Sequence, residues 1–322
     1  MSATKQIASL SLDLDNQWSY MKTHGDPGWQ LFPSYLDIVV PRVLNFLKTR
    51  NLLITFFIVG QDAALEKNRD ALASIAAAGH EIGNHSFHHE PWLQLYTEQQ
   101  LETDFERAEE HITRATGQRP IGFRGPGFSF SSAMFQVLAR RGYVYDASTL
   151  PTFLGPLARA YYFMTAQLTP EQKCERQFLF GNFWDGLRPI KPYRWPVDGG
   201  CLIEIPVTTM PVFRVPIHVS YVIYLSMYAP SLALYYFRAA LMLCRLTRTQ
   251  PSLLLHPLDF LGCEDTQELS FFPAMKMPRE RKLEIVSEAL RMLSNEFAVV
   301  TLRQHAQTFY AMPDVSVAEP SF

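Results

Sequence analysis

The sequence predicts an α/β fold built on a parallel sheet, either closed into a barrel or doubly wound. Strand-like apolar runs alternate with segments of helical periodicity along most of the 322 residues. The composition, 48% apolar and 19% charged, is that of a globular protein. Because an α/β barrel routinely runs ~250 residues as one domain, we expect a single domain over 1–310. Insertions are expected at about 155–200 and 210–250, with a loose C-terminal tail over 311–322.

Short apolar runs in the first half of the chain predict strands that are largely buried. These runs are Ile7–Leu14, Leu52–Val59, Glu81–Asn84 and Ile121–Phe123. Between them, apolar residues at helical spacing predict helices. The helices are expected at Leu36–Leu47, Asp62–Ala78 and Leu101–Ile112.

Capping residues mark the ends of these helices. Pro41 is expected in the first turn of the first helix, where its missing N–H costs nothing. Gly79 is expected to end the second helix. Thr97 and Gln100 predict a capping box at the start of the third.

The second half of the chain continues the alternation. Strands are expected at Tyr143–Tyr145, Leu202–Pro206, Ser252–His256 and Ala298–Leu302. One helix is expected to begin at Ser131 and to stop at Gly142, and the last begins near Pro278. Strands that alternate with helices in this way favour parallel pairing.

Charge and cysteine usage exclude several classes of protein. The chain has 29 Lys and Arg against 31 Asp and Glu, so no strong positive field exists to hold nucleic acid. The first residues lack the apolar core of a signal peptide. The four cysteines show no CxxC spacing and predict reduced thiols: Cys174, Cys201, Cys244 and Cys263. We therefore expect a cytoplasmic protein without nucleic-acid partners.

Ionisable residues follow directly after several predicted strands. They are Asp13, Asp15, His85, His89, Arg124, Asp146 and His256. In a (β/α) barrel the loops after the strands converge on one rim, where the chemistry takes place. The sequence therefore predicts that these residues, although far apart along the chain, meet at one site.

Three of these residues form a candidate metal site. His85 and His89 are four apart, a spacing that in a helical turn places both imidazoles on one face. Asp15 is the candidate third ligand. The alternative is a hydrogen-bonded histidine cluster without metal. His80 and His88 are expected to be bystanders.

Asp13 and Asp15 point the same way along their strand, which crowds two like charges. A cation on Asp15 would relieve this repulsion and leave Asp13 free to act as a base, whereas the alternative is a turn-capping pair. Arg124 could keep Asp13 ionised and oriented, or form an ordinary ion pair. Asp146 either completes a chain from base to arginine to aspartate or caps its loop.

His256 ends a strand, and Pro257 favours extended backbone there. A histidine in this place can donate a proton to a leaving amine, because its pKa lies near neutrality. The alternative is a core histidine with a satisfied hydrogen bond.

These residues, in this order, resemble the polysaccharide deacetylase (NodB-homology) family. The similarity rests on five segments: Ser11–Asp15, Thr55–Phe57, His80–His89, Gly122–Pro126 and Leu253–His256. The variant most resembles an intracellular branch of peptidoglycan-deacetylase-like and allantoinase-like proteins. The resemblance implies a distorted (β/α)7 barrel, here with helical insertions late in the chain.

The resemblance also implies a reaction. A divalent cation, usually zinc, would be held by Asp15, His85 and His89, with Asp13 as base and His256 as acid. The protein would be a hydrolase that removes an N-acetyl or O-acetyl group from a carbohydrate. Two rivals remain: an allantoinase-like cyclic-imide hydrolase on the same barrel, and a catalytically silent carbohydrate-binding protein. The chain departs from the family pattern at Asn16, where glycine is usual, and Asp146 lacks its downstream partner.

Two late segments have unusual composition. The aromatic segment 161–195 is expected to overhang the rim and shape a sugar groove. Residues 205–258 contain no Asp, Glu or Lys. Within them, 214–248 predicts either a helical hairpin that packs on the barrel or on a second subunit of a homo-oligomer, or a peripheral membrane-facing element suited to a lipid-linked amino sugar. A membrane-spanning helix is not expected, because Pro230 interrupts the apolar run.

Overall fold

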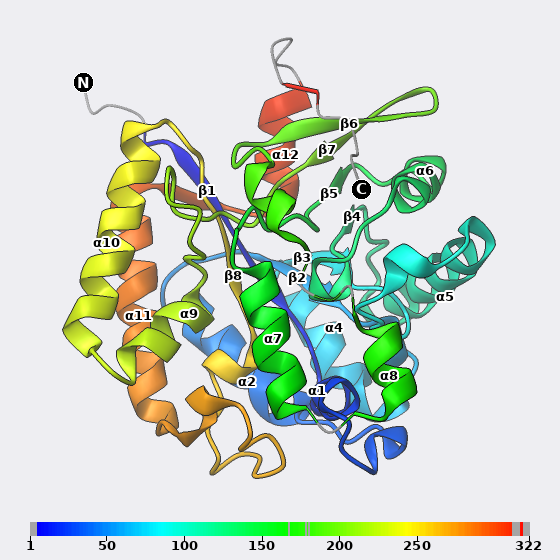
Figure 1. Cartoon of the computed structure of the whole chain (residues 1–322), viewed down its shortest axis with the longest axis horizontal. Helices are drawn as coiled ribbons and strands as arrows, with labels where there is room; N and C mark the ends of the chain where they lie inside the picture. Colours follow the sequence, from blue (N-terminus) through cyan, green and yellow to red (C-terminus); the bar gives the residue numbers. More distant parts are fainter. Residues whose placement is uncertain (1–4, 167, 178, 180, 311–315, 318–322) are drawn as a thin grey trace.

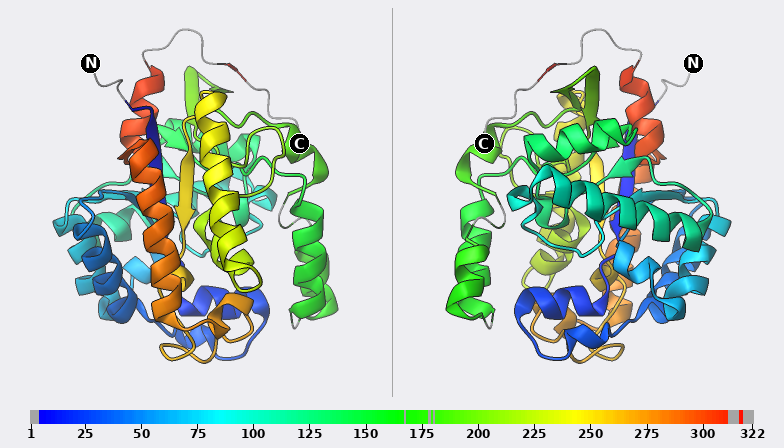
Figure 2. Two further views of the ribbon diagram at one scale, coloured as in Figure 1. Left: turned by 90° about the vertical axis from the view of Figure 1, so that its left-hand side faces the viewer. Right: turned by 90° about the vertical axis from the view of Figure 1, so that its right-hand side faces the viewer.

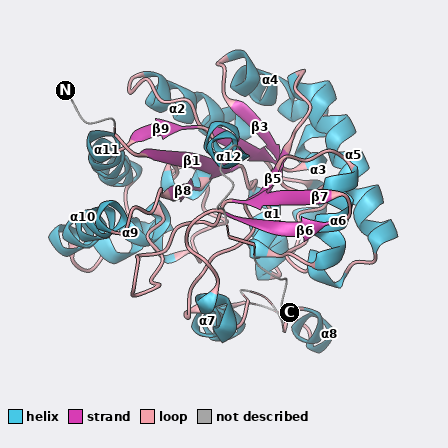
Figure 3. Ribbon diagram, turned by 90° about the horizontal axis from the view of Figure 1, so that it is seen from above, coloured by secondary structure: helices cyan, strands magenta, loops and turns pink. Residues whose placement is uncertain are grey.

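The protein is organised around one curled sheet of nine strands, shown in the computed structural model of Figures 1 and 3. The structure describes residues 5–166, 168–177, 179, 181–310 and 316–317. The strands are β1 (Ile7–Asp13), β2 (Thr55–Ile58), β3 (Glu81–Asn84), β4 (Gly122–Phe123), β5 (Tyr145–Asp146), β6 (Tyr193–Val197), β7 (Gly200–Glu204), β8 (Ser252–Leu255) and β9 (Ala298–Val300). Their order across the sheet is β6-β7-β5-β4-β3-β2-β1-β8, and β9 pairs with β1.

Helices lie around the sheet, as the two side views of Figure 2 and the view from above in Figure 3 show. The α-helices are α1 (Gln17–His24), α2 (Leu36–Lys48), α3 (Gly60–Ala63), α4 (Arg69–Ala77), α5 (Glu98–Thr116), α6 (Ser132–Arg140), α7 (Gly155–Thr165), α8 (Pro170–Glu175), α9 (Val219–Ser226), α10 (Pro230–Leu246), α11 (Arg279–Glu296) and α12 (Leu302–Tyr310). The short 3-10 helices are η1 (Trp29–Leu31), η2 (Glu66–Asn68), η3 (Leu93–Leu95), η4 (Pro126–Phe128), η5 (Phe183–Leu187), η6 (Pro257–Asp259) and η7 (Pro273–Lys276).

The predicted α/β class and distorted barrel are confirmed. The run from β7 through β5, β4, β3, β2 and β1 to β8 is parallel throughout, whereas β6 forms an antiparallel hairpin with β7. The two ends of this run approach each other beyond β7, where the N–H of Thr208 donates to the carbonyl of Ser252 at 2.9 Å. The barrel is therefore distorted at the seam between β7 and β8.

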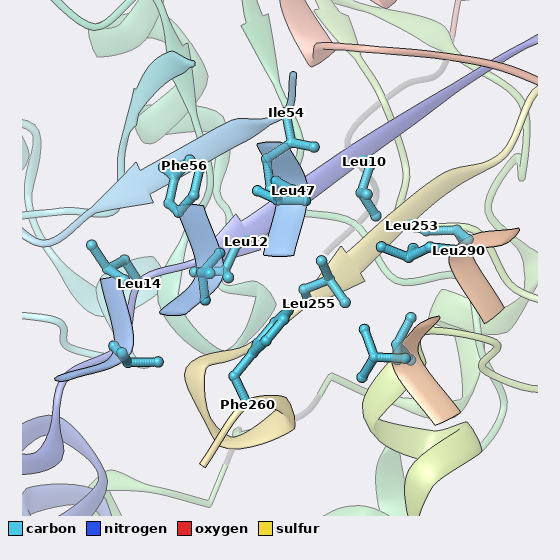
Figure 4. Packing of buried hydrophobic residues seen from close by; sticks show 14 of the residues in the cluster. Leu10, Leu12, Leu14, Leu47, Ile54, Phe56, Leu253, Leu255, Phe260 and Leu290 are labelled. Atoms are coloured by element: carbon cyan, nitrogen blue, oxygen red, sulfur yellow. The ribbon is translucent and has the colours of Figure 1, made fainter. Parts of the chain in front are cut away.

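Alternation along β1 separates the core from the barrel interior. Leu10, Leu12 and Leu14 point to one side, where they join the main hydrophobic core beneath the helices (Figure 4). The residues between them include Ser11 and Asp13, whose side chains meet Arg124 from β4's end. Because successive side chains of a strand face opposite ways, the apolar set anchors β1 while the polar set reaches the functional rim.

Strand register brings the carboxyl ends of the strands level. Leu12 pairs with Leu255, so Asp13 and His256 follow at adjacent positions on β1 and β8. Asn84 pairs with Phe123, so His85 and Arg124 likewise follow side by side. Parallel strands thus deliver residues distant in sequence to one edge, as the predicted rim requires.

Two helix predictions were wrong in detail. Pro41 lies inside α2, which begins at Leu36, and the proline is exposed on the solvent side. The carbonyl of Asp37, which loses its helical donor there, belongs to an exposed residue, so the loss is tolerated. The predicted helix Asp62–Ala78 is broken into α3, η2 and α4. It breaks because the buried Asp62 side chain turns inwards and Asn68 donates to its carbonyl.

The segment 210–250 forms the connection from β7 to β8. Helix α10 buries Ala233, Phe237 and Leu241 in the main core, and it packs with α9 against α11. The packing on the barrel that the sequence predicts as one alternative is therefore present, whereas contact with a second subunit or with a membrane stays a prediction. No helix in the described part of the chain is long and apolar enough to cross a membrane.

Two further expectations concern cysteines and the C-terminal tail. Cys201, Cys244 and Cys263 are free thiols, as the spacing of cysteines predicts. Of the tail 311–322, only Ser316 and Val317 are among the described residues, and Val317 forms a bridge with Arg194. The remainder of the predicted tail lies outside them.

Candidate active site

Asp15, His85 and His89 converge at the carboxyl edge of the sheet. Nε2 of His89 lies 3.0 Å from Oδ1 of Asp15, and Nε2 of His85 lies 3.3 Å from the same oxygen. The candidate ligand atoms of all three residues lie within 4.8 Å of one another, and all three residues are buried. The structure therefore brings together the three residues that the sequence suggests as metal ligands.

The two histidines meet through a loop and not through the helical turn considered from their spacing. Ser86 and His89 have left-handed backbone, with φ of 62° and 52°. The Ser86 hydroxyl accepts a hydrogen bond from the His89 N–H at 3.1 Å, which fixes this tight loop. Strained backbone of this kind concentrates at functional sites. The loop turns both imidazoles towards Asp15.

Hydrogen bonding prepares His85 as a ligand. Its Nδ1 lies 2.6 Å from the carbonyl of Arg124 and donates to it, which leaves the lone pair on Nε2 facing Asp15. This is the outer contact that orients metal-binding histidines in proteins. Nδ1 of His89 is buried and has no hydrogen-bond partner in the described part of the chain. Two imidazoles and one carboxylate form a donor set that suits zinc and leaves room for water or substrate.

Opposing effects set the ionisation of this cluster. Burial by itself raises the pKa of Asp15, but the imidazoles of His89 and His85 outweigh burial and hold the pKa well below its ordinary value. Burial also acts to lower the pKa of His85, but the carboxylates of Asp13 and Asp15 raise it overall. Asp15 is therefore an anion that attracts positive charge, whether from protons or from a cation.

Asp13 is held by a different partner. Nη1 of Arg124 donates to Oδ1 of Asp13 at 2.7 Å and to the hydroxyl of Ser11 at 2.8 Å. Nε of Arg124 donates to the carbonyl of Ala147 at 2.9 Å, and the guanidinium lies over the Phe57 ring at 4.4 Å. The guanidinium is fully buried and fixed on several sides. It therefore holds the Asp13 carboxyl in one orientation.

Asp146 caps its own loop. Its carboxyl oxygens accept from the hydroxyl of Ser148 at 2.7 Å and from the N–H of Ser148 at 3.1 Å. Burial, together with the neighbouring Glu204 carboxyl, raises the pKa of Asp146 well above its ordinary value. Among the ion pairs of the described residues, none joins Asp146 to Arg124. The geometry thus matches the capping alternative, and a catalytic role for Asp146 stays a prediction.

His256 follows β8 beside Asp13, as the register of β1 and β8 requires. Its Nδ1 lies 3.0 Å from the hydroxyl of Ser220, and its backbone N–H donates to Oδ2 of Asp259 at 2.8 Å. The ring of His218 lies 6.0 Å away, centroid to centroid. His256 is therefore held at the rim by residues from both α9 and η6.

Several residues of the site escaped sequence analysis. Ser11 was identifiable as a polar residue on the inward side of β1, but Ser220, Asp259 and His218 lie in segments without a local signal. His218 is buried, and burial together with His256 and Arg124 keeps its pKa well below the ordinary value.

Asn16, the departure from the family pattern, supports the loop after Asp15. Its side-chain oxygen accepts from the N–H of Gln17 at 2.8 Å and so caps α1. Its amide donates to Oδ1 of Asp62 at 2.7 Å, and Nε1 of Trp18 donates to the same oxygen at 2.9 Å. Burial raises the pKa of Asp62 to about 7.

The two predicted bystander histidines lie apart from the cluster. Nδ1 of His80 accepts from the N–H of Ile54 at 3.2 Å, at the opposite end of β3. Nε2 of His88 lies 3.2 Å from Nη1 of Arg107 on α5. Both contacts occupy ring atoms in structural roles.

A cavity of roughly 290 Å³ adjoins the histidine loop and the turn after Arg124. Its lining includes Pro91, Gln94 and Phe128 from these loops, Arg159 from α7, and Asn182 and Asp185 from the aromatic segment 161–195. Part of the segment 161–195 therefore shapes a pocket near the candidate site.

Comparison with known proteins bears on this geometry. Residues 26–145 match the family model for polysaccharide deacetylase. This part of the chain is therefore similar to the polysaccharide deacetylase family. The matched residues include His85, His89 and Arg124, whereas Asp13, Asp15 and His256 lie outside them. Asp13 and Asp15 precede the matched segment in the sequence and His256 follows it, and the fold brings all three next to it.

Curated relatives cover the same part of the chain. A peptidoglycan deacetylase of Helicobacter pylori is 31% identical over 114 residues, which are 35% of this chain and 38% of that protein. A peptidoglycan-N-acetylmuramic acid deacetylase of Bacillus subtilis is 32% identical over 110 residues, 34% of this chain and 41% of that protein. The chain thus matches only about two fifths of the length of these relatives.

Solved structures share the deacetylase fold over nearly the whole chain. One from Mycobacterium smegmatis covers 100% of this chain and 97% of its own, with a TM-score of 0.63 and 21% identity. A probable polysaccharide deacetylase from Pseudomonas aeruginosa covers 96% of this chain and 92% of its own, with a TM-score of 0.61 and 17% identity. The allantoinase Puue covers 98% of this chain and 94% of its own, with a TM-score of 0.61 and 17% identity. The fold therefore extends beyond the matched family segment.

Proposed function

We propose that this protein is a metal-dependent hydrolase that removes the N-acetyl group from an amino sugar of a glycan or of its lipid-linked form. The observation that carries the proposal is the separation of the two aspartates of β1. Asp15 contacts the two imidazoles, whereas Asp13 contacts Arg124. One carboxylate is thus available to a cation and the other to a proton. The peptidoglycan deacetylases among the relatives support an amino-sugar substrate.

Asp15, His85 and His89 would hold the cation. The fixed tautomer of His85 and the depressed pKa of Asp15 both fit a positive ion better than an isolated histidine cluster. When bound, a divalent ion such as zinc polarises the amide carbonyl and lowers the pKa of water towards about 7. The roles proposed below for Asp13 and His256 are the same for any divalent metal.

Asp13 is the proposed general base. Its carboxylate lies beside the candidate metal ligands and accepts the proton of the attacking water. Arg124 and Ser11 hold it in place, so the base is oriented before substrate binds. As water adds to the acetamide carbon, the carbonyl becomes a tetrahedral oxyanion.

His256 is the proposed general acid. Ser220 occupies Nδ1, which leaves Nε2 as the nitrogen that can protonate the amine of the sugar. Cleavage of the C–N bond then yields acetate and a free amino sugar. Asp13 and His256, side by side on β1 and β8, can thus serve the two proton transfers of one hydrolysis.

Acetate release is the direct test. The wild-type protein is incubated with N-acetylated oligosaccharides, lipid-linked amino sugars and cyclic ureides, with chelator and with added zinc. We expect acetate from an N-acetylated sugar, loss of activity with chelator and recovery with zinc. Turnover of cyclic ureides alone would replace this proposal with the allantoinase-like alternative. Binding of sugars without any turnover would leave a carbohydrate-binding protein.

Exposed apolar side chains support a lipid-linked substrate and peripheral membrane contact. Most of the large apolar side chains exposed in the described part of the chain lie between Leu157 and Leu246. Tyr228 and Tyr235, on the α9–α10 side, are 71% and 68% exposed. The surrounding residues 205–258 carry only positive fixed charge, which suits anionic headgroups. The positive charge of Arg245 is less available to headgroups, because its guanidinium pairs with Glu296 on α11.

Vesicle binding tests this part of the proposal. We expect the protein to sediment with phosphatidylglycerol vesicles at low salt but not with phosphatidylcholine vesicles. The double variant Tyr228→Ser and Tyr235→Ser should lose binding. Leu31→Ser should keep it, because Leu31 is an even more exposed apolar residue that lies outside this face. Self-association that depends on the same tyrosines, without vesicle binding, would instead assign this face to a homo-oligomer.

A further inference from the structure

The short helix α3 follows the strand that lies between the two loops with the candidate metal ligands. That strand is β2, the neighbour of both β1 and β3 in the sheet. At its end, the carbonyl of Phe57 accepts from the N–H of Leu14 at 2.9 Å. The carbonyl of Ile58 accepts from the N–H of His85, also at 2.9 Å. The loop after β1, which carries Asp15, and the loop after β3, which carries both histidines, therefore leave the sheet on the two sides of β2.

The backbone of α3 is bonded to the histidine loop. The N–H of Gly60 donates to the carbonyl of Ser86 at 2.8 Å, and the N–H of Gln61 donates to the carbonyl of Phe87 at 2.9 Å. The approach is close, because a Cβ on Gly60 would lie 2.7 Å from Cδ2 of Phe87. Helix α3 thus holds the middle of the loop that turns both imidazoles towards Asp15.

The side chain of Asp62, in the same helix, is bonded to residues that follow Asp15. Its Oδ1 accepts from Nδ2 of Asn16 at 2.7 Å and from Nε1 of Trp18 at 2.9 Å. Nδ2 of Asn68 is a third donor, at 3.2 Å. A carboxyl oxygen can accept these bonds in either ionisation state. Asp62 is 1% exposed, so water does not compete for them.

The donors from the loop after β1 lie next to the candidate ligands. Asn16 directly follows Asp15 in the chain. The hydroxyl of Tyr35 donates to the carbonyl of Asp15 at 2.5 Å, and the N–H of Tyr35 donates to the side chain of Asn16 at 3.2 Å. The indole of Trp18 packs edge-to-face with the ring of His89, with the centroids 6.4 Å apart. A contact that holds Asn16 and Trp18 therefore also fixes Asp15 relative to the imidazoles.

We propose that Asp62 is a positioning residue that aligns Asp15 with the two imidazoles for metal binding. The inference rests on the metal centre of the proposed function. Asp62 is not itself a candidate ligand, and it acts through Asn16 on one side and through the backbone of α3 on the other. A glycine at position 16, usual in the family pattern, has no side chain to make this bond. The bond between Asn16 and Asp62 is therefore a feature of this chain.

Zinc affinity tests the inference, measured by competition with a chelating zinc indicator on variants that circular dichroism shows to be folded. Asp62→Leu removes the acceptor and should weaken zinc binding by about 10- to 100-fold, the usual effect of losing an outer contact of a metal site. Asp62→Asn keeps an acceptor oxygen and should retain most of the affinity. Asn16→Gly removes the bond from the other side and should also weaken zinc binding. The double variant Asp62→Leu and Asn16→Gly should lose little more than the weaker-binding single variant, because both remove the same bond.

The matched control is Glu81→Leu. Glu81 is also buried, and its carboxyl accepts from the hydroxyls of Thr55 and Tyr145 at 2.6 and 2.9 Å. It is the first residue of β3, whereas the histidine loop follows the last. We expect both leucine variants to lower the thermal stability, and only Asp62→Leu to weaken zinc binding. Unchanged zinc affinity in folded Asp62→Leu, or an equal loss in Glu81→Leu, would overturn the inference.

Zinc binding also separates this inference from the proposed reaction. No substrate is present, so the expected order of affinities would support the alignment even if no sugar released acetate. A wild-type protein that does not bind zinc would overturn the inference together with the metal centre. Unchanged zinc affinity in Asn16→Gly would overturn the inference alone, whether or not Asp62→Leu folds.

Discussion

Arg124 and Asp13 form a buried ion pair, with Nη1 2.7 Å from Oδ1 and the guanidinium fully excluded from water. Asp15 follows two residues later, yet it contacts His85 and His89 instead. Two carboxylates that would repel each other are thus assigned to separate partners. This division underlies the proposed chemistry, and each half of it can be tested.

Replacing Arg124 should lower the free energy of unfolding, because Asp13 loses its ion-pair partner. Arg124→Met leaves the Asp13 carboxylate buried without its partner, which should lower the free energy of unfolding by about 3–5 kcal/mol. Urea denaturation measures this loss. The double variant Arg124→Met and Asp13→Asn should recover part of the stability, because it removes the unpaired charge as well. Equal losses in the single and double variants would contradict the pairing argument.

Asp13 and Asp15 should differ in their effect on metal content. Asp13→Asn should lower kcat by about 10²- to 10⁴-fold, the usual contribution of a general base, while the protein retains its metal. Asp15→Asn should lose the metal, since it removes the carboxylate shared by the two histidines. Metal analysis of the purified variants separates these outcomes. Loss of metal from Asp13→Asn would show that the roles are not divided in this way.

Gly125 allows the turn that follows Arg124. A Cβ on this residue would lie 2.0 Å from the carbonyl oxygen of Ser129, a backbone atom that cannot move alone. Gly125→Ala should therefore destabilise the protein by about 1–3 kcal/mol and displace Arg124, with a loss of activity. Gly200→Ala is the control, because open space surrounds Gly200. Thermal unfolding measures the loss of stability, and acetate release measures the loss of activity. Equal stability and equal activity of the two variants would contradict the argument from this contact.

His305 should make stability depend on pH. The buried ring contacts Ser9 at Nδ1 and Gln250 at Nε2, and burial lowers the pKa of His305 from 6.5 to about 3. Between these values the unfolded chain binds a proton that the folded chain does not. The free energy of unfolding should therefore fall as pH drops below 6.5, by up to about 1.4 kcal/mol per pH unit.

His305→Gln keeps a donor for Gln250 and removes the titration. Urea denaturation at several pH values should show a shallower dependence in this variant than in wild type. His111→Gln, at a partly exposed position on α5, should keep the wild-type slope. An unchanged slope in His305→Gln would mean that other groups cause the acid sensitivity.

The sequence predicted correctly those features that depend on interactions between residues close together in the chain. The capping box at Thr97 is present, and Gly117 ends α5 in left-handed backbone. The buried strand predicted over Ile7–Leu14 is present as β1, and its Leu10, Leu12 and Leu14 lie in the core. The helix over Asp62–Ala78 was wrong because periodicity does not register that Asp62 is drawn inwards by Asn16 and Trp18. Such contacts join residues more than forty positions apart and have no local signal.

The sequence alone determined which residues stand at strand ends, because apolar runs and their polar successors are local features. It predicted that seven residues meet at one rim, and in the structure all seven lie at or just after the carboxyl ends of the strands: Asp13, Asp15, His85, His89, Arg124, Asp146 and His256. Only the tertiary structure decided their partners: Arg124 for Asp13, the imidazoles for Asp15, and Ser220 for His256. Partners depend on strand register and on loops that return from distant parts of the chain, and no local pattern encodes where those loops end.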